Sequence, residues 1–386
     1  MRKTVYLDYQ ASTPVDPRVV AKMLPLLQCG YGNPHSSDHI FGWRAADVVE
    51  QSRQEVAAVI GADSDEIVFT SGATESNNLA LFGSFRRNCT RRRNKLLVSA
   101  IEHKCVLEAA FCLARDYDAV FQLIPVDNCG LVDLNLIESE LNKDDVLVVS
   151  VMSVNNEVGA IQPIKTIGRL AREKGAFFHT DAAQALNAID IDVYEQNIDL
   201  LSLSAHKIYG PQGIGALYVR RELQEQLEPL IYGGGQQLGL RSGTVPAFLT
   251  AGFAAAIGAL RGEIAAGERE SVAKKRDRFV KGIMEGGFPV RVNGPSLAVR
   301  HPGNANLLFQ DFANHDILSG LQPQVAASTG SACTSGTPEP SYVLRAMGLT
   351  HEEASSSIRF SLGRFTTDEE VEIAIEATLQ VLAQLR

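Results

Sequence analysis

Short apolar runs alternate with helical segments through the middle of the chain. Strand-like runs lie at residues 67–70, 96–99, 120–126, 146–152, 176–180, 199–204 and 215–219. Helical periodicity is present at residues 45–60, and helices are expected to follow several strands, towards Phe85, from Glu102, over 134–141 and over 164–174. This alternation predicts a mostly parallel, seven-stranded sheet with helices on both faces. In such α/β sheets, ligands bind at the carboxyl ends of the strands.

The two ends of the chain show a different pattern. Residues 1–40 contain four prolines (Pro14, Pro17, Pro25 and Pro34) and predict an irregular segment. A long helical stretch covers residues 250–286, strands are predicted at 288–292, 304–309 and 357–361, and a closing helix at 368–385. We therefore expect a large α/β domain over residues 14–255 and a smaller α+β domain formed by residues 1–13 and 256–386.

The composition is that of an ordinary soluble globular protein, with 45% hydrophobic and 21% charged residues among 386. No run of about 18 apolar residues indicates a membrane span, and the first residues lack the apolar core of a signal peptide. The six cysteines show no CxxC pairing and are interpreted as reduced thiols. A net charge of −9 argues against a surface built for nucleic acid. We expect a cytoplasmic protein that binds neither a membrane nor nucleic acid directly.

Residues 86–95 form a basic stretch with Arg or Lys at positions 86, 87, 91, 92, 93 and 95. A solvated loop after a helix is the favoured interpretation, and a surface for an acidic partner or nucleic acid is the alternative. His35 and His39 have the spacing of metal ligands on a helix. Pro34 and the serines after His35 argue against a helix there, and no third ligand is near. No metal site is predicted.

An anion site is predicted where the strand at 67–70 passes into the next helix. The connection reads Ser71-Gly72-Ala73-Thr74, so its amides and the Thr74 hydroxyl would face a ligand at the helix N-terminus. There is no GxxxxGK[ST] loop, and the glycines at 210–215 precede a strand, which argues against a dinucleotide fingerprint. A plain helix cap is the alternative for residues 71–74.

A lysine and an aspartate stand at the ends of two predicted strands. Lys207 follows the strand at 199–204, where partial desolvation lowers the pKa of an amine and makes it a candidate Schiff-base nucleophile. Asp181 follows the strand at 176–180 and needs a cationic partner there, such as a protonated pyridine nitrogen. Alone, Lys207 reads as a surface lysine and Asp181 as a helix cap. Together they indicate pyridoxal 5′-phosphate as the cofactor.

A series of motifs follows in one order along the chain. They lie at residues 71–78 (SGATESNN), 102–104 (EHK), 154–159 (VNNEVG), 181–184 (DAAQ), 204–207 (SAHK), 241–244 (RSGT), 330–333 (GSAC) and 357–360 (SIRF). From Leu7-Asp8 to the final helix, the chain resembles the NifS/IscS-like cysteine desulfurases, class V aminotransferases among the fold-type I pyridoxal phosphate enzymes. The resemblance implies a fold-type I architecture whose large domain binds the cofactor, a homodimer, and L-cysteine as substrate.

The resemblance also implies roles for the matching residues. Lys207 would carry the cofactor as a Schiff base, Asp181 would pair with its pyridine nitrogen, and Gln184 would bond its phenolic oxygen. His103 would stack on the ring and transfer protons. The phosphate would be held by Ala73, Thr74, Ser204 and His206, and Thr244 would reach the phosphate of the partner subunit. Asn156 and Arg359 would bind the substrate carboxylate at the cofactor, which suits a planar guanidinium.

Cys333 would be the catalytic nucleophile on a loop at about residues 324–340. Residues 326–340 hold no large apolar side chain, so the thiol has nothing to bury against and is expected to be accessible. The resemblance implies that this thiolate takes the sulfur of L-cysteine as a persulfide while L-alanine leaves. The sulfur would then pass to an acceptor protein of iron–sulfur cluster assembly, tRNA thiolation or DNA phosphorothioation.

The chain departs from the family pattern at two places. Residues 236–239 read Gln-Gln-Leu-Gly where family members commonly have Gln/His-Glu-Arg-Gly, which puts the contacts of that loop in doubt. Residues 318–329 look similar to the branch that supplies sulfur for DNA phosphorothioation.

Two alternatives to the cysteine desulfurase activity are kept. The alternative activity is that of a selenocysteine lyase or another class V enzyme. The alternative of another class is a sulfur-carrying docking partner that uses the basic stretch.

Overall fold

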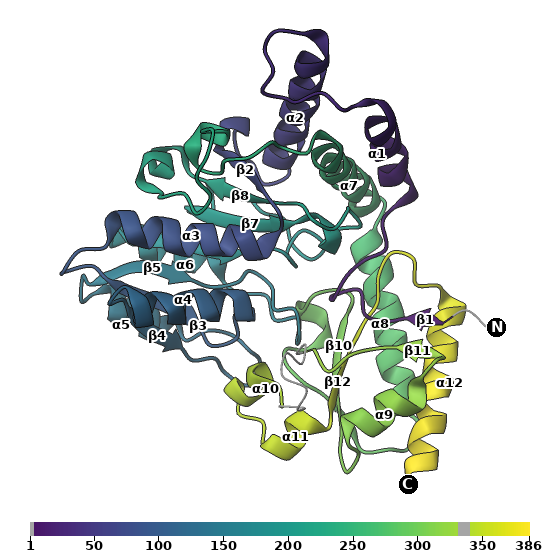
Figure 1. The fold of residues 1–386 in the computed structure, drawn as a ribbon. Helices are drawn as coiled ribbons and strands as arrows, with labels where there is room; N and C mark the ends of the chain where they lie inside the picture. The colour runs from purple at the N-terminus through teal and green to yellow at the C-terminus, as the bar shows by residue number, and fades with distance from the viewer. Residues whose placement is uncertain (1–3, 331–339) are drawn as a thin grey trace.

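The computed structural model describes residues 4–330 and 340–386, so Cys333 lies outside the described residues. A seven-stranded sheet forms the centre of the fold, with the strand order β2-β8-β7-β6-β5-β3-β4 (Figure 1). The strands are β2 (Ile67–Thr70), β3 (Lys95–Ser99), β4 (Val120–Ile124), β5 (Val146–Ser150), β6 (Phe177–Asp181), β7 (Leu200–Ser204) and β8 (Gly215–Val219). Neighbours from β7 to β4 are parallel, and β8 runs antiparallel to β2 and β7. The predicted mostly parallel, seven-stranded sheet is confirmed.

Both faces of this sheet are buried by helices. Successive residues of a strand point to opposite faces, so Leu97 and Leu201 face a different cluster from Leu96 and Leu200. The first face carries residues of α2 (Ile40–Ala58), α5 (Leu134–Leu141), α6 (Ile164–Glu173) and α7 (Ala247–Ala265). The second face carries α3 (Ala73–Asn88) and α4 (Lys104–Asp116). This burial explains why the strands read as continuous apolar runs.

The expectation of an irregular segment over residues 1–40 is wrong for α1 (Pro17–Cys29). Asp16 caps this helix by accepting a hydrogen bond from the Arg18 amide, and Pro17 occupies the first turn, where a missing N–H costs nothing. Pro25 lies inside the helix. Prolines that the sequence reading treated as breakers are therefore compatible with a helix that packs against α7.

The predicted long helix over residues 250–286 is two helices. α7 ends at Ala265, and α8 (Glu268–Met284) begins after Gly267, whose φ of 86° is accessible to glycine at little cost. A three-stranded sheet then forms in the order β12 (Ser357–Ser361), β10 (Asn304–Phe309) and β9 (Val290–Val292). A parallel pair joins β1 (Val5–Tyr6) to β11 (Val325–Ala326). The remaining helices are α9 (Asn314–Leu321), α10 (Tyr342–Ala346), α11 (His351–Ser355) and α12 (Asp368–Leu385).

A second hydrophobic cluster links the start of the chain to its end. Val5 and Leu7 are buried together with residues of α8, β10, β12 and α12, including Phe279 and Phe360. Figure 1 shows β1 and β11 beside α12, away from the large sheet. This cluster is consistent with a small domain that includes the N-terminal segment. The domain boundaries at residues 13/14 and 255/256 stay a prediction.

Within residues 4–330 and 340–386, α7 is the one helix whose length and composition would allow it to cross a membrane. Its contacts explain its apolar character. Phe253, Ala256 and Leu260 are buried in the cluster on the first face of the sheet, and the helix packs against α1 and α2. The apolar composition is that of a core helix.

The basic stretch is paired with acidic side chains of the same chain. Arg92 and Arg93 both form ion pairs with Asp144. Lys95 Nζ lies 3.0 Å from a carboxylate oxygen of Glu140. The pairs of Arg92 and Arg93 support the interpretation of a solvated segment after α3, whereas Lys95 is a buried residue of β3. None of these pairs lends support to a docking surface for an acidic partner.

Candidate active site

A cavity of about 740 Å³ opens where several strands of the large sheet end. Its lining comes from the carboxyl ends of β2, β3, β5, β6 and β7, from the segment before α1, and from β12. The predicted site residues that line it are Ala73, Thr74, His103, Asn156, Asp181, Gln184, Ser204, His206, Lys207 and Arg359. Segments far apart in the sequence therefore meet in one cavity, at the edge of the sheet expected for an α/β fold.

Lys207 lies directly after β7, in a short 3₁₀ turn. Its Nζ donates to the carbonyl oxygens of Gln10 and Ala11, both at 2.7 Å. Burial, together with the nearby Arg359 guanidinium, lowers the pKa of Lys207 to about 8, although the charge of Asp181 opposes the shift. A lysine in this environment is a neutral amine for part of the time near neutral pH, as Schiff-base chemistry requires.

Asp181 ends β6 and is almost fully buried. Its two oxygens accept hydrogen bonds from Asn77 Nδ2 at 2.7 Å and from the Ala183 amide at 2.9 Å. Glu102 lies nearby and is completely buried; burial and the charge of Asp181 raise its pKa well above the usual range. Glu102 is therefore a neutral carboxyl, and Asp181, held by its two hydrogen bonds, is the group that would pair with a protonated pyridine nitrogen.

The N-terminus of α3 faces the cavity without a side-chain cap. Gly72 precedes this helix with a φ of 152°, and a Cβ added there would meet no atom within 4 Å. Uncapped amides at a helix N-terminus suit a phosphate. The cradle at α3, the fixed carboxylate of Asp181 and the amine of Lys207 together fit pyridoxal 5′-phosphate.

His206 lies in the same cavity and contacts the N-terminal segment. Its Nδ1 is 3.2 Å from the Ser12 hydroxyl. Burial and the neighbouring Lys207 lower the pKa of His206 to about 4, so the ring is neutral near neutral pH. A neutral imidazole can donate one hydrogen bond to a phosphate without adding charge.

His103 caps α4 and is open to the cavity. Its Nδ1 accepts from the Cys105 amide at 3.2 Å, which assigns the proton of the neutral ring to Nε2. Burial of the ring against the protein lowers the pKa of His103, although the charge of Asp181 opposes this shift. The ring therefore offers an Nε2–H group to the cavity.

Cys105 both packs against the core and borders the cavity. Its half-buried side chain lies against the cluster under α4. Burial and the charge of Asp181 raise the pKa of Cys105 to about 12. The thiol stays protonated, which argues against Cys105 as a nucleophile.

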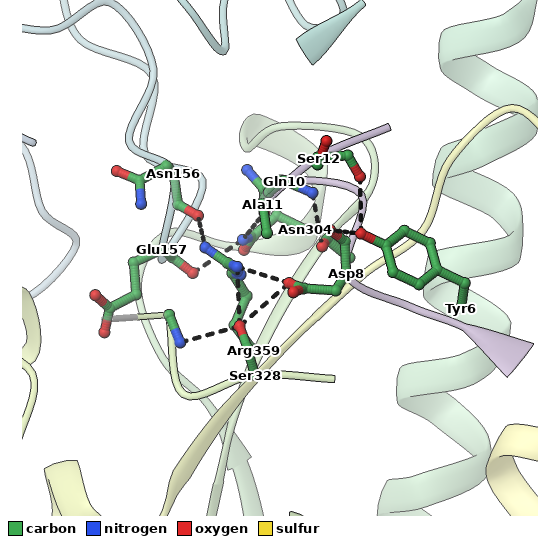
Figure 2. A network of polar contacts seen from close by, with 12 residues as sticks. Tyr6, Asp8, Gln10, Ala11, Ser12, Asn156, Glu157, Asn304, Ser328 and Arg359 are labelled. Atoms are coloured by element: carbon green, nitrogen blue, oxygen red, sulfur yellow. Dashed lines mark hydrogen bonds and ion pairs between the residues drawn. The ribbon is translucent and has the colours of Figure 1, made fainter. Parts of the chain in front are cut away.

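Arg359 projects from β12 into a dense polar network (Figure 2). Nη2 donates to Asp8 Oδ1 at 2.7 Å and to the Ser328 hydroxyl at 2.9 Å, and Nη1 donates to the Asn156 carbonyl at 2.8 Å. The Arg359 side chain is only 4% exposed. The sequence placed Arg359 and Asn156 in one site, and the structure brings them into contact.

Sequence reasoning missed several residues that hold this site in place. Gln10 is the clearest case, because its carbonyl accepts from both Lys207 Nζ and Gln184 Nε2, the latter at 2.8 Å. Asp8 and Gln10 lie in a segment read as irregular, so no periodic pattern marked them. Asn77 was within a quoted motif but received no role, since only the fold brings it to Asp181.

Two predicted site residues are not part of this cavity. Thr244 is exposed on the connection before α7 and does not line it, so its predicted contact with a partner subunit stays a prediction. Cys333 lies outside the described residues. Across the described ranges there is also no group of three or more His, Cys, Asp or Glu side chains that could hold a metal ion.

The loop with the unusual Gln-Gln-Leu-Gly sequence is docked by its own glutamine. The Gln237 side-chain amide accepts from the Phe69 amide at 2.7 Å and donates to the Phe69 carbonyl at 2.9 Å. Arg241, in the following motif, pairs with Glu75 of α3 at 2.9 Å. This departure from the family pattern therefore keeps the loop attached to β2 and α3.

Comparison with known proteins places the chain in a family. The Aminotransferase class-V model matches residues 5–373. A relative from Dictyostelium discoideum, named "Probable cysteine desulfurase, mitochondrial", is 47% identical and aligns with 100% of this chain and 84% of its own length. "Cysteine desulfurase IscS" of Rickettsia massiliae is 47% identical over an alignment that covers 99% of this chain and 92% of that relative. A solved structure titled "NIFS-LIKE PROTEIN" superposes with a TM-score of 0.91 at 33% identity, covering 99% of this chain and 100% of that one. The chain belongs to the class V aminotransferases and, within them, to the pyridoxal phosphate-dependent cysteine desulfurases.

Proposed function

We propose that this cysteine desulfurase removes the sulfur of L-cysteine through Lys207, Asp181, Arg359 and Cys333. The observation that carries the assignment is the cavity in which a lysine of lowered pKa, a fixed carboxylate and a guanidinium face one space. When bound, pyridoxal 5′-phosphate supplies an electron sink that makes bonds of an attached amino acid labile. The side chains of the cavity supply the groups that bind, orient and deprotonate the substrate.

Lys207 is the proposed base and acid at the substrate. Its amine is held by the carbonyls of Gln10 and Ala11, and its lowered pKa lets it lose and regain a proton near neutral pH. We propose that Nζ moves the proton at the substrate Cα. His103 presents Nε2–H to the same cavity and is the proposed second proton donor.

Arg359 and Asn156 are the proposed carboxylate site. Both line the cavity, and the Asn156 carbonyl holds the guanidinium at Nη1. A guanidinium recognises a carboxylate with two parallel N–H groups, which fixes the amino acid in one orientation.

Cys333 is the proposed sulfur acceptor. Gly330 and Tyr342, which precede and follow the segment that contains it, both line the cavity, and this supports its reach to the substrate. In the proposed step its thiolate attacks the substrate sulfur, and the sulfur–Cβ bond breaks as the sulfur–sulfur bond forms. The electron pair of the broken bond stays with carbon, which takes a proton and leaves as L-alanine.

A homodimer is proposed because an exposed apolar patch covers the connection between α1 and α2. Tyr31 is 79% exposed and stacks on the half-exposed ring of Phe41 at 5.3 Å between ring centroids, and Trp43 is 55% exposed. A contiguous apolar patch on the surface is a typical mark of a protein–protein interface. An acceptor protein that takes the sulfur onward, and a cytoplasmic location, stay predictions, and the acceptor pathway is open.

The test compares wild type with Cys333→Ala. Wild type is expected to convert L-cysteine to L-alanine and, under a reductant, to sulfide. Cys333→Ala should keep the cofactor absorption band but lose persulfide formation and most sulfide release. A Cys333→Ala enzyme that releases sulfide at the wild-type rate would refute the role of Cys333. Cys333→Ala is expected to lose turnover of L-cysteine but to keep turnover of selenocysteine, because selenocysteine should not strictly need the Cys333 thiol.

A further inference from the structure

Asp8 is in direct contact with the proposed carboxylate site. Its Oδ1 accepts from Arg359 Nη2 at 2.7 Å, and the Ser328 hydroxyl donates to the same oxygen at 3.1 Å (Figure 2). The Asp8 side chain is 19% exposed and lines the cavity. The guanidinium of Arg359 is thus largely covered, and one of the groups that covers it is itself a carboxylate.

The hydrogen bonds of Arg359 leave no free pair of donors for a second carboxylate. Nη2 uses its two N–H groups on Asp8 and Ser328, and Nη1 uses one on Asn156. Nε is buried and has no hydrogen-bond partner among the described residues. A bidentate carboxylate binds Nη2 together with either Nη1 or Nε. A substrate carboxylate that binds Arg359 through two N–H groups must therefore take the place of Asp8 or Ser328 on Nη2.

The main chain of Asp8 is fixed to the strand that carries Arg359. The Ser361 amide donates to the Leu7 carbonyl at 2.7 Å, and the Tyr9 amide donates to the Ser361 carbonyl at 3.2 Å. Ser361 and Arg359 are two residues apart on β12 and point to the same face. Release of Arg359 therefore requires rotation of the Asp8 side chain and not movement of the N-terminal segment.

We propose that Asp8 is a specificity-determining residue, which occupies the carboxylate position on Arg359 until a substrate carboxylate displaces it. The inference rests on the proposed role of Arg359. An incoming carboxylate replaces the Asp8–Arg359 ion pair with its own ion pair to Arg359, so the net gain in binding free energy is small. A ligand without a carboxylate cannot make that exchange and leaves Asp8 in place. Asp8 thereby weakens carboxylate binding in general and keeps Arg359 neutralised between turnovers.

The test measures binding of propionate, a carboxylate with neither amine nor thiol, to the holoenzyme by ligand-observed NMR. In Asp8→Asn no resident carboxylate competes, and the dissociation constant of propionate is expected to fall about tenfold, as for a hydrogen bond between charged groups. Asp8→Glu restores a carboxylate and should stay within about threefold of wild type. The matched control is Glu75→Gln, which removes a carboxylate that lines the same cavity but pairs with Arg241. It should change the constant less than about twofold.

Arg359→Ala separates the two levels of the proposal. If it binds propionate as tightly as wild type, the carboxylate role of Arg359 fails, and the role of Asp8 fails with it. If Arg359→Ala loses binding while Asp8→Asn leaves the dissociation constant unchanged or raises it, Arg359 keeps its role and the inference about Asp8 is overturned. Equal tightening by Glu75→Gln would also overturn it, because loss of any cavity charge would then be the cause.

Discussion

Lys207 Nζ lies 2.7 Å from the carbonyl oxygen of Gln10, a residue 197 positions earlier in the chain. The side chain of Gln10 is buried, and its Oε1 accepts from Asn304 Nδ2 of β10 at 2.6 Å. The N-terminal segment therefore links the lysine at the large sheet to the three-stranded sheet. The position of the reactive amine depends on the packing of both parts of the molecule.

The lowered pKa of Lys207 predicts how the apoprotein takes up its cofactor. Because the pKa is about 8, the reactive neutral amine increases about fivefold between pH 7 and pH 8. The rate of Schiff-base formation with added pyridoxal 5′-phosphate should rise by the same factor and level off above pH 9. Stopped-flow absorbance measures it. A rate that keeps rising tenfold per pH unit up to pH 10 would show an ordinary lysine pKa and contradict the prediction.

Asn77 is predicted to hold Asp181 for the cofactor. Asn77→Ala removes the 2.7 Å hydrogen bond to the Asp181 carboxylate, and the affinity for pyridoxal 5′-phosphate should fall about tenfold. Equilibrium dialysis of the cofactor measures the change. The matched control is Asn78→Ala, because the Asn78 side chain bonds the exposed Thr74 carbonyl of the same helix. Equal losses in both variants would point to damage of α3 and not to Asp181.

Asp16 is predicted to stabilise the fold in a pH-dependent way. Hydrogen bonds from Arg18 lower the pKa of Asp16 to about 2, and Arg364 also donates to this buried carboxylate at 2.9 Å. Asp16→Asn should lower the free energy of unfolding at pH 7 by about 2–3 kcal/mol. A carboxyl whose pKa is lower in the folded than in the unfolded protein stabilises the fold at pH values above its unfolded pKa. The difference in free energy of unfolding between wild type and Asp16→Asn should therefore shrink as the pH falls from about 4 towards 2.

Urea denaturation at several pH values measures this difference. Asp65→Asn serves as the control, because its pair with Arg221 is half-exposed on both sides and should contribute less than about 0.5 kcal/mol. A difference for Asp16→Asn that stays constant down to pH 2 would exclude ionisation of Asp16 as its source.

The exposed patch around Trp43 is predicted to lie in the interface of the proposed homodimer. Trp43→Glu places a charge in the patch and should convert the dimer to a monomer at micromolar concentration. Analytical ultracentrifugation measures the state, and the single tryptophan allows fluorescence to follow dissociation of wild type on dilution. Tyr232→Glu is the comparison, since Tyr232 is 69% exposed on another segment. If the Trp43→Glu protein remains dimeric, the dimer interface does not include this patch.

The sequence predicted the sheet well because each of its strands carries its own signal. Strands buried on both faces read as apolar runs, and these runs marked β5, β6 and β7 within one or two residues. Signals that depend on context were missed. Pro17 fits the first turn of α1 only once Asp16 caps it, and Gly267 divides a helical stretch only through its positive φ.

The site could be predicted as a set of residues but not as a network. Its members were identified through motifs, and ten of them meet in one cavity. The partners of those members carry no local pattern. Asp8 reaches Arg359 across 351 positions, so only the packing of the N-terminal segment on β12 brings them together. The side chains that position the reactive groups are therefore the part of the site that cannot be predicted from a single sequence.

The contact of residues 7–10 with Ser361 of β12 also constrains how the chain folds during synthesis. Leu7 and Tyr9 exchange main-chain hydrogen bonds with Ser361, so these early residues find their partners only after residue 361 has left the ribosome. Until then the carbonyls that hold Lys207 are out of place, even where the large sheet has already formed. The N-terminal segment must therefore meet β12 before Lys207 is held as it is in the folded protein, which makes this contact between distant segments a late step of folding.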